Sequence, residues 1–186
     1  MGYIQTTLEC VDKLIEQKRI KSLCDLGAQN NYTVNYLPAP YMSEWFKDNG
    51  IDYMSIDLNG ENDSKQWDLS EPLKTSRVFD MVVNAGTLEH IKDLYQGFAN
   101  VHKLTSKGGL MLHENPKTGN WPLHGNHYFD EEFYIELANK AGYEIIELKS
   151  TVSAHNYETG NNIFCLMLKV KEGFISREQF PKVYES

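Results

Sequence analysis

Hydrophobic residues along the chain fall into two patterns, amphipathic stretches and short apolar runs. In the first stretch, Leu8, Val11, Leu14 and Ile15 recur at helical spacing while charged residues fill the other face, which predicts a helix over 3–19. Apolar runs predict strands at 21–26, 51–58 and 77–86, and a weaker run predicts a short strand at 65–69. The run at 77–86 is nearly all apolar, which is typical of a strand buried on both faces.

The same alternation continues between and after these strands. The stretch 40–50 predicts a helix, with Pro40 near its first turn and Gly50 at its end. A helix over 91–109 that ends in glycines is expected next, followed by a strand at 110–116. A helix over 129–143 has Asp130 as its cap and Gly142 as its stop. The last two strands, 144–152 and 162–171, are separated by about ten residues without helical pattern, so we expect them to pair antiparallel.

Strands that alternate with helices and end in a hairpin predict an α/β fold. We expect a three-layer sandwich with a mainly parallel, seven-stranded sheet that ends in an antiparallel hairpin. The 186 residues suit one domain over 1–186, with an N-terminal helix (3–19), a core (20–171) and a C-terminal tail (172–186).

Composition and charge narrow the class of protein. Hydrophobic residues make up 41% of the chain, and no apolar run approaches the roughly 20 residues of a membrane span. The net charge of -8 argues against tight nonspecific binding to nucleic acid. Cys10, Cys24 and Cys165 are far apart and odd in number, which is neither a disulfide framework nor metal-ligand spacing. A cytoplasmic protein is the prediction.

Polar and small residues follow the predicted strands at the point where each strand ends. In an open parallel sheet these ends share one edge, and ligands bind there. The predicted cofactor-binding residues come from the ends of the first four strands: Asp25, Gly27, Gln29, Asp57, Leu58, Asp68, Leu69, Asn84, Ala85 and Gly86.

Three of these ends carry an aspartate, a spacing that suits a nucleoside with a cationic tail. Asp57 can accept both ribose hydroxyls, Asp68 can accept the adenine amino group, and Asp25 can pair with an ammonium group. A dinucleotide would instead need further glycines for its pyrophosphate, whereas the loop after the first strand has only Gly27.

Taken in order along the chain, these segments resemble a class I S-adenosylmethionine-dependent methyltransferase of the small single-domain kind. The resemblance runs from Ile20 to Lys171 through "DLGAQNN", "SIDLNGE", "WDLSEPL" and "FDMVVNAGTLEHIKDLYQGFANVHKLTSKGGLMLHENP". The later "HGNHYFDEEFYIELANKAGYEIIEL" resembles the segment that follows in this family. The resemblance implies a Rossmann-like fold, S-adenosylmethionine as cofactor, S-adenosylhomocysteine as product, and direct in-line methyl transfer.

The glycine loop departs from the family pattern at two positions. Gln29 and Asn31 stand where the second and third glycines of the family align. Asparagine tolerates a left-handed backbone, so Asn31 is a mild change. Gln29 places a side chain where backbone usually approaches the ligand. The connection to the next helix, "NYTVNYLPAP", is also longer than usual. We expect an altered loop that still binds the cofactor.

The segment after the fifth strand supplies the candidates for acceptor chemistry. Removal of a proton from an oxygen acceptor needs a base, and His127 and His124 are the predicted catalytic residues, ahead of His113 and Glu114. Aromatic residues gather in the two loops that flank the predicted pocket. Among them, Tyr32, Trp121 and Tyr128 are the predicted substrate-binding residues, while Tyr36, Tyr41 and Trp45 belong to the same gathering. They favour a small-molecule or partly apolar acceptor.

A metal site and three other functions are alternatives to a small-molecule methyltransferase. Glu89 and His90, with His124 or His127, could complete a metal site, but no second carboxylate lies in the first turn, so we expect no metal and a helix start with Thr87 as cap. A short-chain dehydrogenase, suggested by "VVNAG", lacks its glycine-rich opening and its Tyr-x-x-x-Lys pair. A nucleic-acid methyltransferase is disfavoured by the acidic balance. A non-catalytic, cofactor-binding regulatory or partner protein stays as the alternative function. The sequence carries no signal for an oligomeric state.

Overall fold

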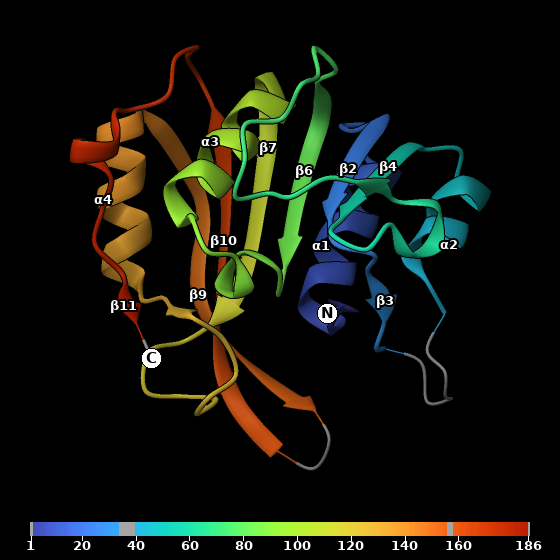
Figure 1. The fold of residues 1–186 in the computed structure, drawn as a ribbon. Helices are drawn as coiled ribbons and strands as arrows, with labels where there is room; N and C mark the ends of the chain where they lie inside the picture. The colour runs from blue at the N-terminus through green and yellow to red at the C-terminus, as the bar shows by residue number, and fades with distance from the viewer. Residues whose placement is uncertain (1, 34–39, 156–157, 186) are drawn as a thin grey trace.

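A seven-stranded sheet forms the centre of the protein in the computed structural model, which describes residues 2–33, 40–155 and 158–185 (Figure 1). The strand order is β5-β4-β2-β6-β7-β10-β9, and β10 runs antiparallel to both of its neighbours while the other paired strands are parallel. The predicted fold class is therefore confirmed. The strands are β2 (Ser22–Leu26), β4 (Asp52–Asp57), β5 (Lys65–Gln66), β6 (Phe79–Ala85), β7 (Thr105–Pro116), β9 (Tyr143–His155) and β10 (Glu158–Lys169).

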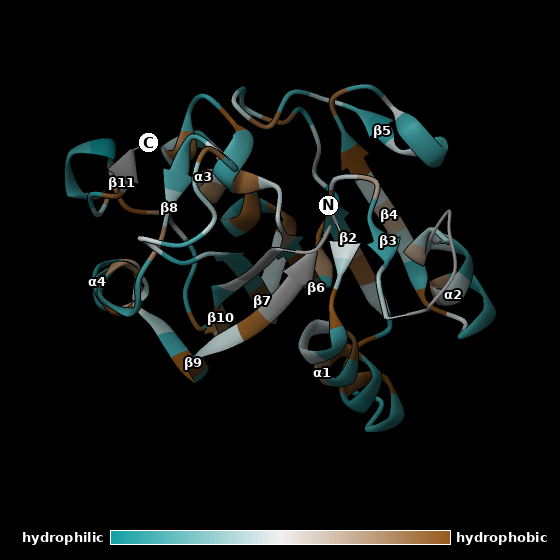
Figure 2. Ribbon diagram, turned by 90° about the horizontal axis from the view of Figure 1, so that it is seen from below, coloured by the Kyte–Doolittle hydropathy of each residue, from teal (hydrophilic) through white to brown (hydrophobic). Residues whose placement is uncertain are grey.

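Helices cover both faces of the sheet and give the molecule its three layers. Side chains of α1 (Gln5–Glu16) and α2 (Met42–Asp48) pack in one hydrophobic cluster, and those of α3 (Leu94–Leu104) and α4 (Glu131–Ala141) pack in another. Figure 2 looks toward the ends of the strands and shows α1 and α3 on opposite sides of the sheet. Met81, Val82 and Val83 of β6 alternate between the clusters, because neighbouring side chains of a strand point to opposite faces. None of the described helices is long and apolar enough to cross a membrane.

Two helices, α1 and α3, differ most from their predicted ranges. The first helix spans Gln5–Glu16 rather than 3–19, because Gly2–Tyr3 forms strand β1, which pairs parallel with β3 (Asn30–Asn31). The helix expected over 91–109 ends at Leu104, and β7 begins at once with Thr105. Gly108 and Gly109 therefore lie inside a strand instead of ending a helix. A Cβ at position 109 would come within 2.8 Å of the Ser106 carbonyl oxygen, so this glycine is required by close packing.

The C-terminal part contains more secondary structure than the predicted hairpin and tail. β9 and β10 pair as expected, but the paired segment extends to His155 and Glu158, beyond the predicted strand ends. The predicted tail 172–186 contains a short 3-10 helix, η3 (Arg177–Gln179), and strand β11 (Tyr184–Glu185), which pairs with β8 (His127–Tyr128). Figure 1 shows this segment running beside α4.

Candidate active site

A cavity of about 460 Å³ lies at the carboxyl ends of the parallel strands, which is where the fold predicts a ligand. Five of the predicted cofactor-binding residues line it: Gly27, Asp57, Leu58, Asp68 and Leu69. The other lining residues are Ile56, Asn59, Trp67, Ser70, Thr87, His90, Ile91 and Lys92.

Asp57, at the end of β4, is the most firmly positioned polar residue of the cavity. Its side chain is buried, and Oδ2 accepts a hydrogen bond from the Ala28 N–H at 3.2 Å while Oδ1 accepts one from the Asn59 N–H at 2.8 Å. A carboxylate has about four lone-pair sites, so both oxygens keep acceptor capacity for a ligand. The carboxylate also links the loop after β2 to the turn after β4, and this fixes two walls of the cavity.

Gly27 makes the turn that brings the β2 loop against the cavity. Its φ is 89°, a backbone conformation that favours glycine, and its N–H donates to the Ile56 carbonyl at 2.6 Å. The single glycine of the opening motif therefore provides the turn that the sequence assigned to it.

Gln29 folds its side chain back into the protein instead of projecting it into solvent. Nε2 donates to the Leu26 carbonyl and, at 3.0 Å, to Thr87 Oγ1, and the side chain is only 1% exposed. Within the described residues, its Oε1 has no hydrogen-bond partner. The amide thus occupies two acceptors at the carboxyl ends of β2 and β6. Gln29 itself does not line the described cavity, although Thr87 does.

The structure places Asp25 away from the cavity, in a pair of tyrosine hydrogen bonds. Tyr3 donates to Oδ1 at 2.6 Å and Tyr53 donates to Oδ2 at 2.8 Å, and the carboxyl is fully buried. Burial raises the pKa of Asp25 to about 7, although both hydrogen bonds lower it. Its role beside an ammonium group stays a prediction, and in this structure both carboxylate oxygens accept from tyrosine hydroxyls, one of them brought in by β1.

Asn84, Ala85 and Gly86, at the end of β6, do not line the described cavity. Asn84 Oδ1 accepts hydrogen bonds from the N–H groups of Thr87 and Leu88 at 3.2 and 3.0 Å, and it thereby holds the 3-10 turn η2 (Leu88–His90). Ala85 is buried, and Gly86 has a φ of 79°. These residues position η2, whose last residue, His90, lines the cavity.

Thr87 and Trp67 are lining residues that the sequence analysis did not assign to the cavity. Thr87 precedes η2 as expected for a cap, but its side chain makes no capping hydrogen bond and donates instead to the Leu26 carbonyl at 2.5 Å. Trp67 directly precedes Asp68 in the segment "WDLSEPL", and its position beside that aspartate is the sequence signal that could have placed it at the cavity.

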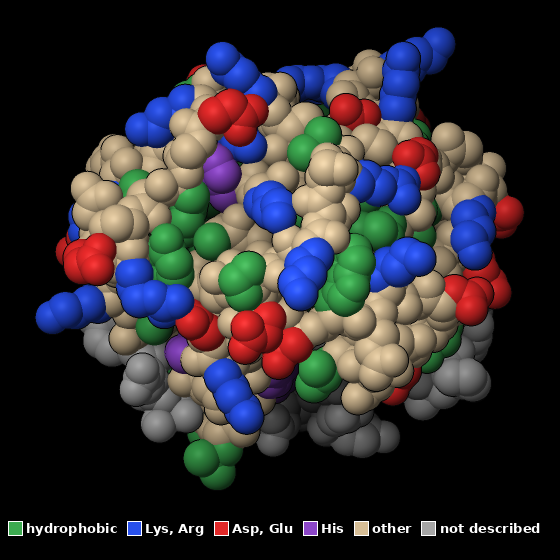
Figure 3. Space-filling view, turned by 45° about the horizontal axis from the view of Figure 1, so that its top comes forward, with side chains coloured by type: hydrophobic (Ala, Val, Ile, Leu, Met, Phe, Trp, Pro, Cys, Tyr) green, Lys and Arg blue, Asp and Glu red, His purple; other side chains and the backbone are tan. Residues whose placement is uncertain are grey.

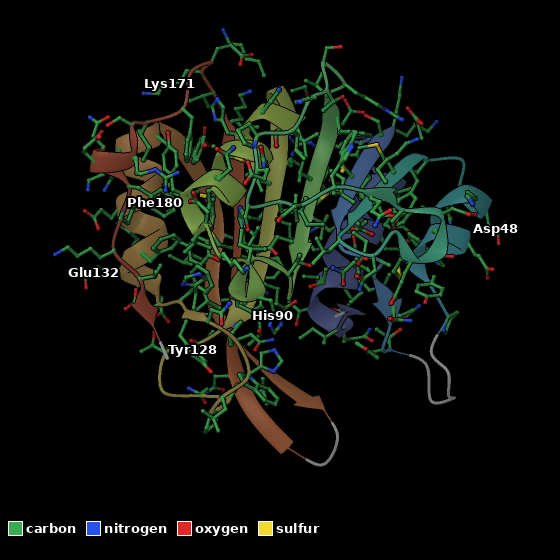
Figure 4. All side chains as sticks on the ribbon, viewed as in Figure 1. Asp48, His90, Tyr128, Glu132, Lys171 and Phe180 are labelled. Carbon is green, nitrogen blue, oxygen red and sulfur yellow. The ribbon has the colours of Figure 1, made fainter. Side chains whose placement is uncertain are left out.

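The predicted acceptor residues form a supporting loop beside η2. Tyr128 is buried, its hydroxyl donates to the Trp121 carbonyl at 2.8 Å, and it accepts from the His124 N–H at 3.0 Å. The Trp121 indole donates to Asn162 Oδ1 at 2.9 Å. His127 is buried, with Nε2 3.0 Å from the Ile91 carbonyl. Figure 4 shows Tyr128 and His90 near the same lower end of the sheet.

His124 has a half-exposed ring in this loop, 5.1 Å from the ring of His90 between centroids. Tyr32, from the other predicted loop, packs instead over β1, since a Cβ at Gly2 would come within 2.5 Å of its ring. Tyr36 lies outside the described residues. The structure therefore gathers His124, His127, Trp121 and Tyr128 at one place and leaves Tyr32 apart from them.

His113 and Glu114, the other two candidate bases, are buried in opposite core layers. The His113 ring stacks on Phe98, with ring centroids 5.0 Å apart, and burial lowers its pKa to about 3. Glu114 accepts hydrogen bonds from Thr7 and Thr151, and burial raises its pKa. Both residues stabilise the packing of β7 against its neighbours rather than face the cavity.

Comparison with known proteins agrees with this arrangement. Residues 3–148 match the family described as "Methyltransferase domain", which covers most of the chain, so the protein belongs to this family. The predicted class is thereby confirmed, and S-adenosylmethionine is the methyl donor that this class uses. No curated protein matches the sequence at a significant level.

Several solved structures share the fold. The 1,6-didemethyltoxoflavin-N1-methyltransferase of Burkholderia thailandensis, with bound 1,6-didemethyltoxoflavin and S-adenosylhomocysteine, is 15% identical, with a TM-score of 0.60 over 87% of this chain and 76% of that one. The N-methyltransferase NodS of Bradyrhizobium japonicum, in complex with S-adenosylhomocysteine, is 14% identical, with a TM-score of 0.60 over 88% and 85%. A methyltransferase of Methanosarcina mazei is 11% identical, with a TM-score of 0.66 over 92% and 100%. At these identities the likeness concerns the fold.

Proposed function

We propose that this protein transfers the methyl group of S-adenosylmethionine directly to a small-molecule acceptor. The observation that carries the proposal is the cavity at the carboxyl ends of β2 and β4, with the buried Asp57 carboxylate at its wall. A carboxylate at this place can accept the two hydroxyls of a ribose. The volume of about 460 Å³ is within the range of small-molecule sites.

The residues present fit the nucleoside part of this cofactor. Asp57 would hold the ribose, and Gly27 allows the loop backbone to approach it closely. Leu58, Trp67 and Leu69 offer apolar surface to the base, with Asp68 beside them as an acceptor for its amino group. When bound, S-adenosylmethionine supplies a methyl group that its sulfonium makes electrophilic.

The chain's own contribution to transfer is to align the acceptor and to exclude water. An oxygen acceptor also has a proton to lose, and His127 and His124 stay the predicted bases for it. A small-molecule acceptor is supported by the named acceptor of the Burkholderia thailandensis neighbour. It is also supported by charge: Figure 3 shows Lys and Arg side chains interspersed with Asp and Glu on one face of the molecule, whose formal charge is -8.

Calorimetric titration with S-adenosylhomocysteine tests the cofactor site. We expect micromolar binding by the wild type and a loss of about 10- to 100-fold in Asp57→Ala, because hydrogen bonds to a charged group are worth roughly 1.5–3 kcal/mol. Asp48→Ala is the matched control, since Asp48 lies at the end of α2, far from the cavity (Figure 4). A wild-type protein that does not bind would contradict the proposal.

Gln29 favours one second candidate, a cofactor-binding protein without turnover. Its amide donates to the Leu26 carbonyl and to Thr87 Oγ1, two acceptors that an amino group of a ligand tail could otherwise use. Binding of S-adenosylhomocysteine without methyl transfer across a broad screen of small acceptors would favour this candidate over the enzyme.

A further inference from the structure

A cluster of three potential metal ligands lies at the rim of the cavity. Glu89 and His90 come from η2, and His124 comes from the loop that packs against it. One ligand atom from each lies within 4.8 Å of the other two. Glu89 Oε1 is 3.9 Å from His90 Nε2 and 3.8 Å from His124 Nε2. These distances exceed those of hydrogen bonds, so the two imidazoles face the carboxylate without bonding to it.

Glu89 is the part of the cluster that requires an explanation. Its side chain is 1% exposed, and among the described residues Oε1 has no hydrogen-bond partner. An unpaired buried carboxylate oxygen is costly, and buried charges are usually paired or coordinate a metal. The Oε1 atom points at two nitrogen ligands across a gap that a cation would fill.

The other carboxylate oxygen is already anchored. Asn115 Nδ2 donates to Glu89 Oε2 at 2.8 Å, and Asn115 Oδ1 in turn accepts from Asn84 at 2.9 Å and from the Tyr134 hydroxyl at 2.7 Å. Metal-binding carboxylates are commonly oriented by such outer hydrogen bonds. The network fixes Glu89 in the orientation that leaves Oε1 available.

The loop that carries His124 is attached to η2 by its backbone. The Asn126 N–H donates to the Glu89 carbonyl at 2.7 Å, and Asn126 Nδ2 donates to the His90 carbonyl at 3.0 Å. A Cβ at Gly125 would come within 3.0 Å of the Glu89 carbonyl oxygen, so glycine permits this close approach. His124 is therefore held beside the other two ligands by the fold.

We propose that Glu89 Oε1, His90 Nε2 and His124 Nε2 bind one divalent transition-metal ion of the zinc type. Two imidazole nitrogens and one carboxylate oxygen form a ligand set that suits Zn²⁺, with bonds of about 2.0–2.2 Å. Around a tetrahedral ion with bonds of this length the ligand atoms lie about 3.4 Å apart. The distances of 3.9 and 3.8 Å from Glu89 Oε1 to the two imidazole nitrogens would close to that separation if the half-exposed histidine rings shifted by a few tenths of an ångström. This reverses the expectation from the sequence, where the missing second carboxylate argued against a metal.

Three protein ligands leave a further coordination position open, as in catalytic zinc sites. His90 lines the cavity, so the open position lies at its rim. On the basis of the proposed function, this position would take an oxygen of the methyl acceptor. His124 then acts as a metal ligand rather than as the base.

Metal binding is measured on the full chain without cofactor or acceptor, so its result is independent of methyl transfer. After treatment with chelator and dialysis, the protein is titrated with Zn²⁺ by calorimetry and with Co²⁺ by visible absorption. We expect one equivalent of Zn²⁺ to bind. The visible spectrum of bound Co²⁺ should be typical of a four-coordinate site. His90→Ala and His124→Ala should each weaken binding by about 100-fold or more.

His102→Ala, in α3, where the ring contacts the Tyr143 hydroxyl, is the control variant and should bind as the wild type does. Glu89→Gln keeps the shape of the side chain but removes its charge, and we expect it to weaken binding as well. Glu89 is buried, so its replacement could prevent folding. In that case His90→Ala and His124→Ala, at two half-exposed positions, still test the site. Absence of binding by the wild type at millimolar Zn²⁺, or unchanged binding in His124→Ala, would overturn the proposal.

Discussion

At the scale of single residues, a sequence motif predicts which side chains stand near the end of a strand. The contacts in the folded protein decide which of them line the cavity. Asp25 and Asp57 both stand near strand ends, but Asp25 lies opposite Ser55, two residues before Asp57 in the register of the sheet. Asp57 lines the cavity, whereas Asp25 is bound by two tyrosine hydroxyls. The difference comes from this register and from the two donors, Tyr3 in β1 and Tyr53 in β4. No periodic pattern at position 25 could reveal these partners, because they arrive through tertiary packing.

Gln29 gives the first residue-scale prediction. In Gln29→Ala, the Leu26 carbonyl and Thr87 Oγ1 lose the amide that bonds to them, so the amino-acid tail of a ligand meets less competition. We expect binding of S-adenosylhomocysteine to tighten by about 3- to 10-fold, from the roughly 0.5–1.5 kcal/mol of one hydrogen bond. Binding of 5′-methylthioadenosine, which lacks that tail, should not change. Calorimetric titration of both ligands measures the difference.

Gln17→Ala, an exposed glutamine at the end of α1, serves as the control and should leave both affinities unchanged. Weaker binding of both ligands in Gln29→Ala would instead show that the side chain supports the loop after β2.

At the scale of elements, the order of helices and strands follows from the sequence, whereas their ends do not. The apolar periods predicted α1 to α4 and the seven strands of the sheet. The boundary between α3 and β7 was misplaced, because Gly108 and Gly109 are typical stop residues but here lie in a strand. The tail is a second case: η3 and β11 depend on surfaces of α3, α4 and β8 that only exist once the core has folded.

The tail provides a prediction at this scale. Phe180 is partly buried, and its ring lies 5.6 Å from that of Tyr95, 5.6 Å from that of Phe98 and 5.8 Å from that of Phe133. Phe180→Ala removes these contacts, and we expect the free energy of unfolding to fall by about 1–3 kcal/mol. Urea unfolding followed by circular dichroism measures this change as a lower midpoint.

Leu123→Ala is the control for a lost hydrophobic side chain, because Leu123 is 94% exposed and its removal should alter stability by less than about 0.5 kcal/mol. Equal midpoints for Phe180→Ala and the wild type would mean that the C-terminal segment does not stabilise α3 and α4 in solution.

At the scale of the whole molecule, the sequence predicted the three layers and the edge of the sheet that holds the cavity. Both follow from local patterns, since apolar runs define strands and parallel strands end at one edge. The sequence named His124 and His127 as possible partners of Glu89 and His90 but could not choose between them, because the position of this loop depends on Gly125 and Asn126 packing on η2. Long-range hydrogen bonds of this kind leave no periodic signal in the sequence.

The stability of the whole molecule should depend on pH through Asp25. Its pKa rises from an ordinary value of 3.8 to about 7 on folding, so the native state keeps a proton that the unfolded state has released between these values. Stability from this group is therefore fully present below about pH 4, falls as the pH rises toward 7, and is constant above it. Each pH unit in the window costs about 1.4 kcal/mol.

Asp25→Asn keeps the shape of the side chain but cannot ionise, so it lacks this slope. Urea unfolding of both proteins between about pH 5 and about pH 8 should show the wild type losing on the order of 3 kcal/mol relative to the variant. Glu114, whose pKa is also raised by burial, contributes a slope of the same sign, but it does so in both proteins and cancels in the difference. Parallel stability profiles would mean that the tyrosine hydroxyls hold Asp25 ionised in the folded state.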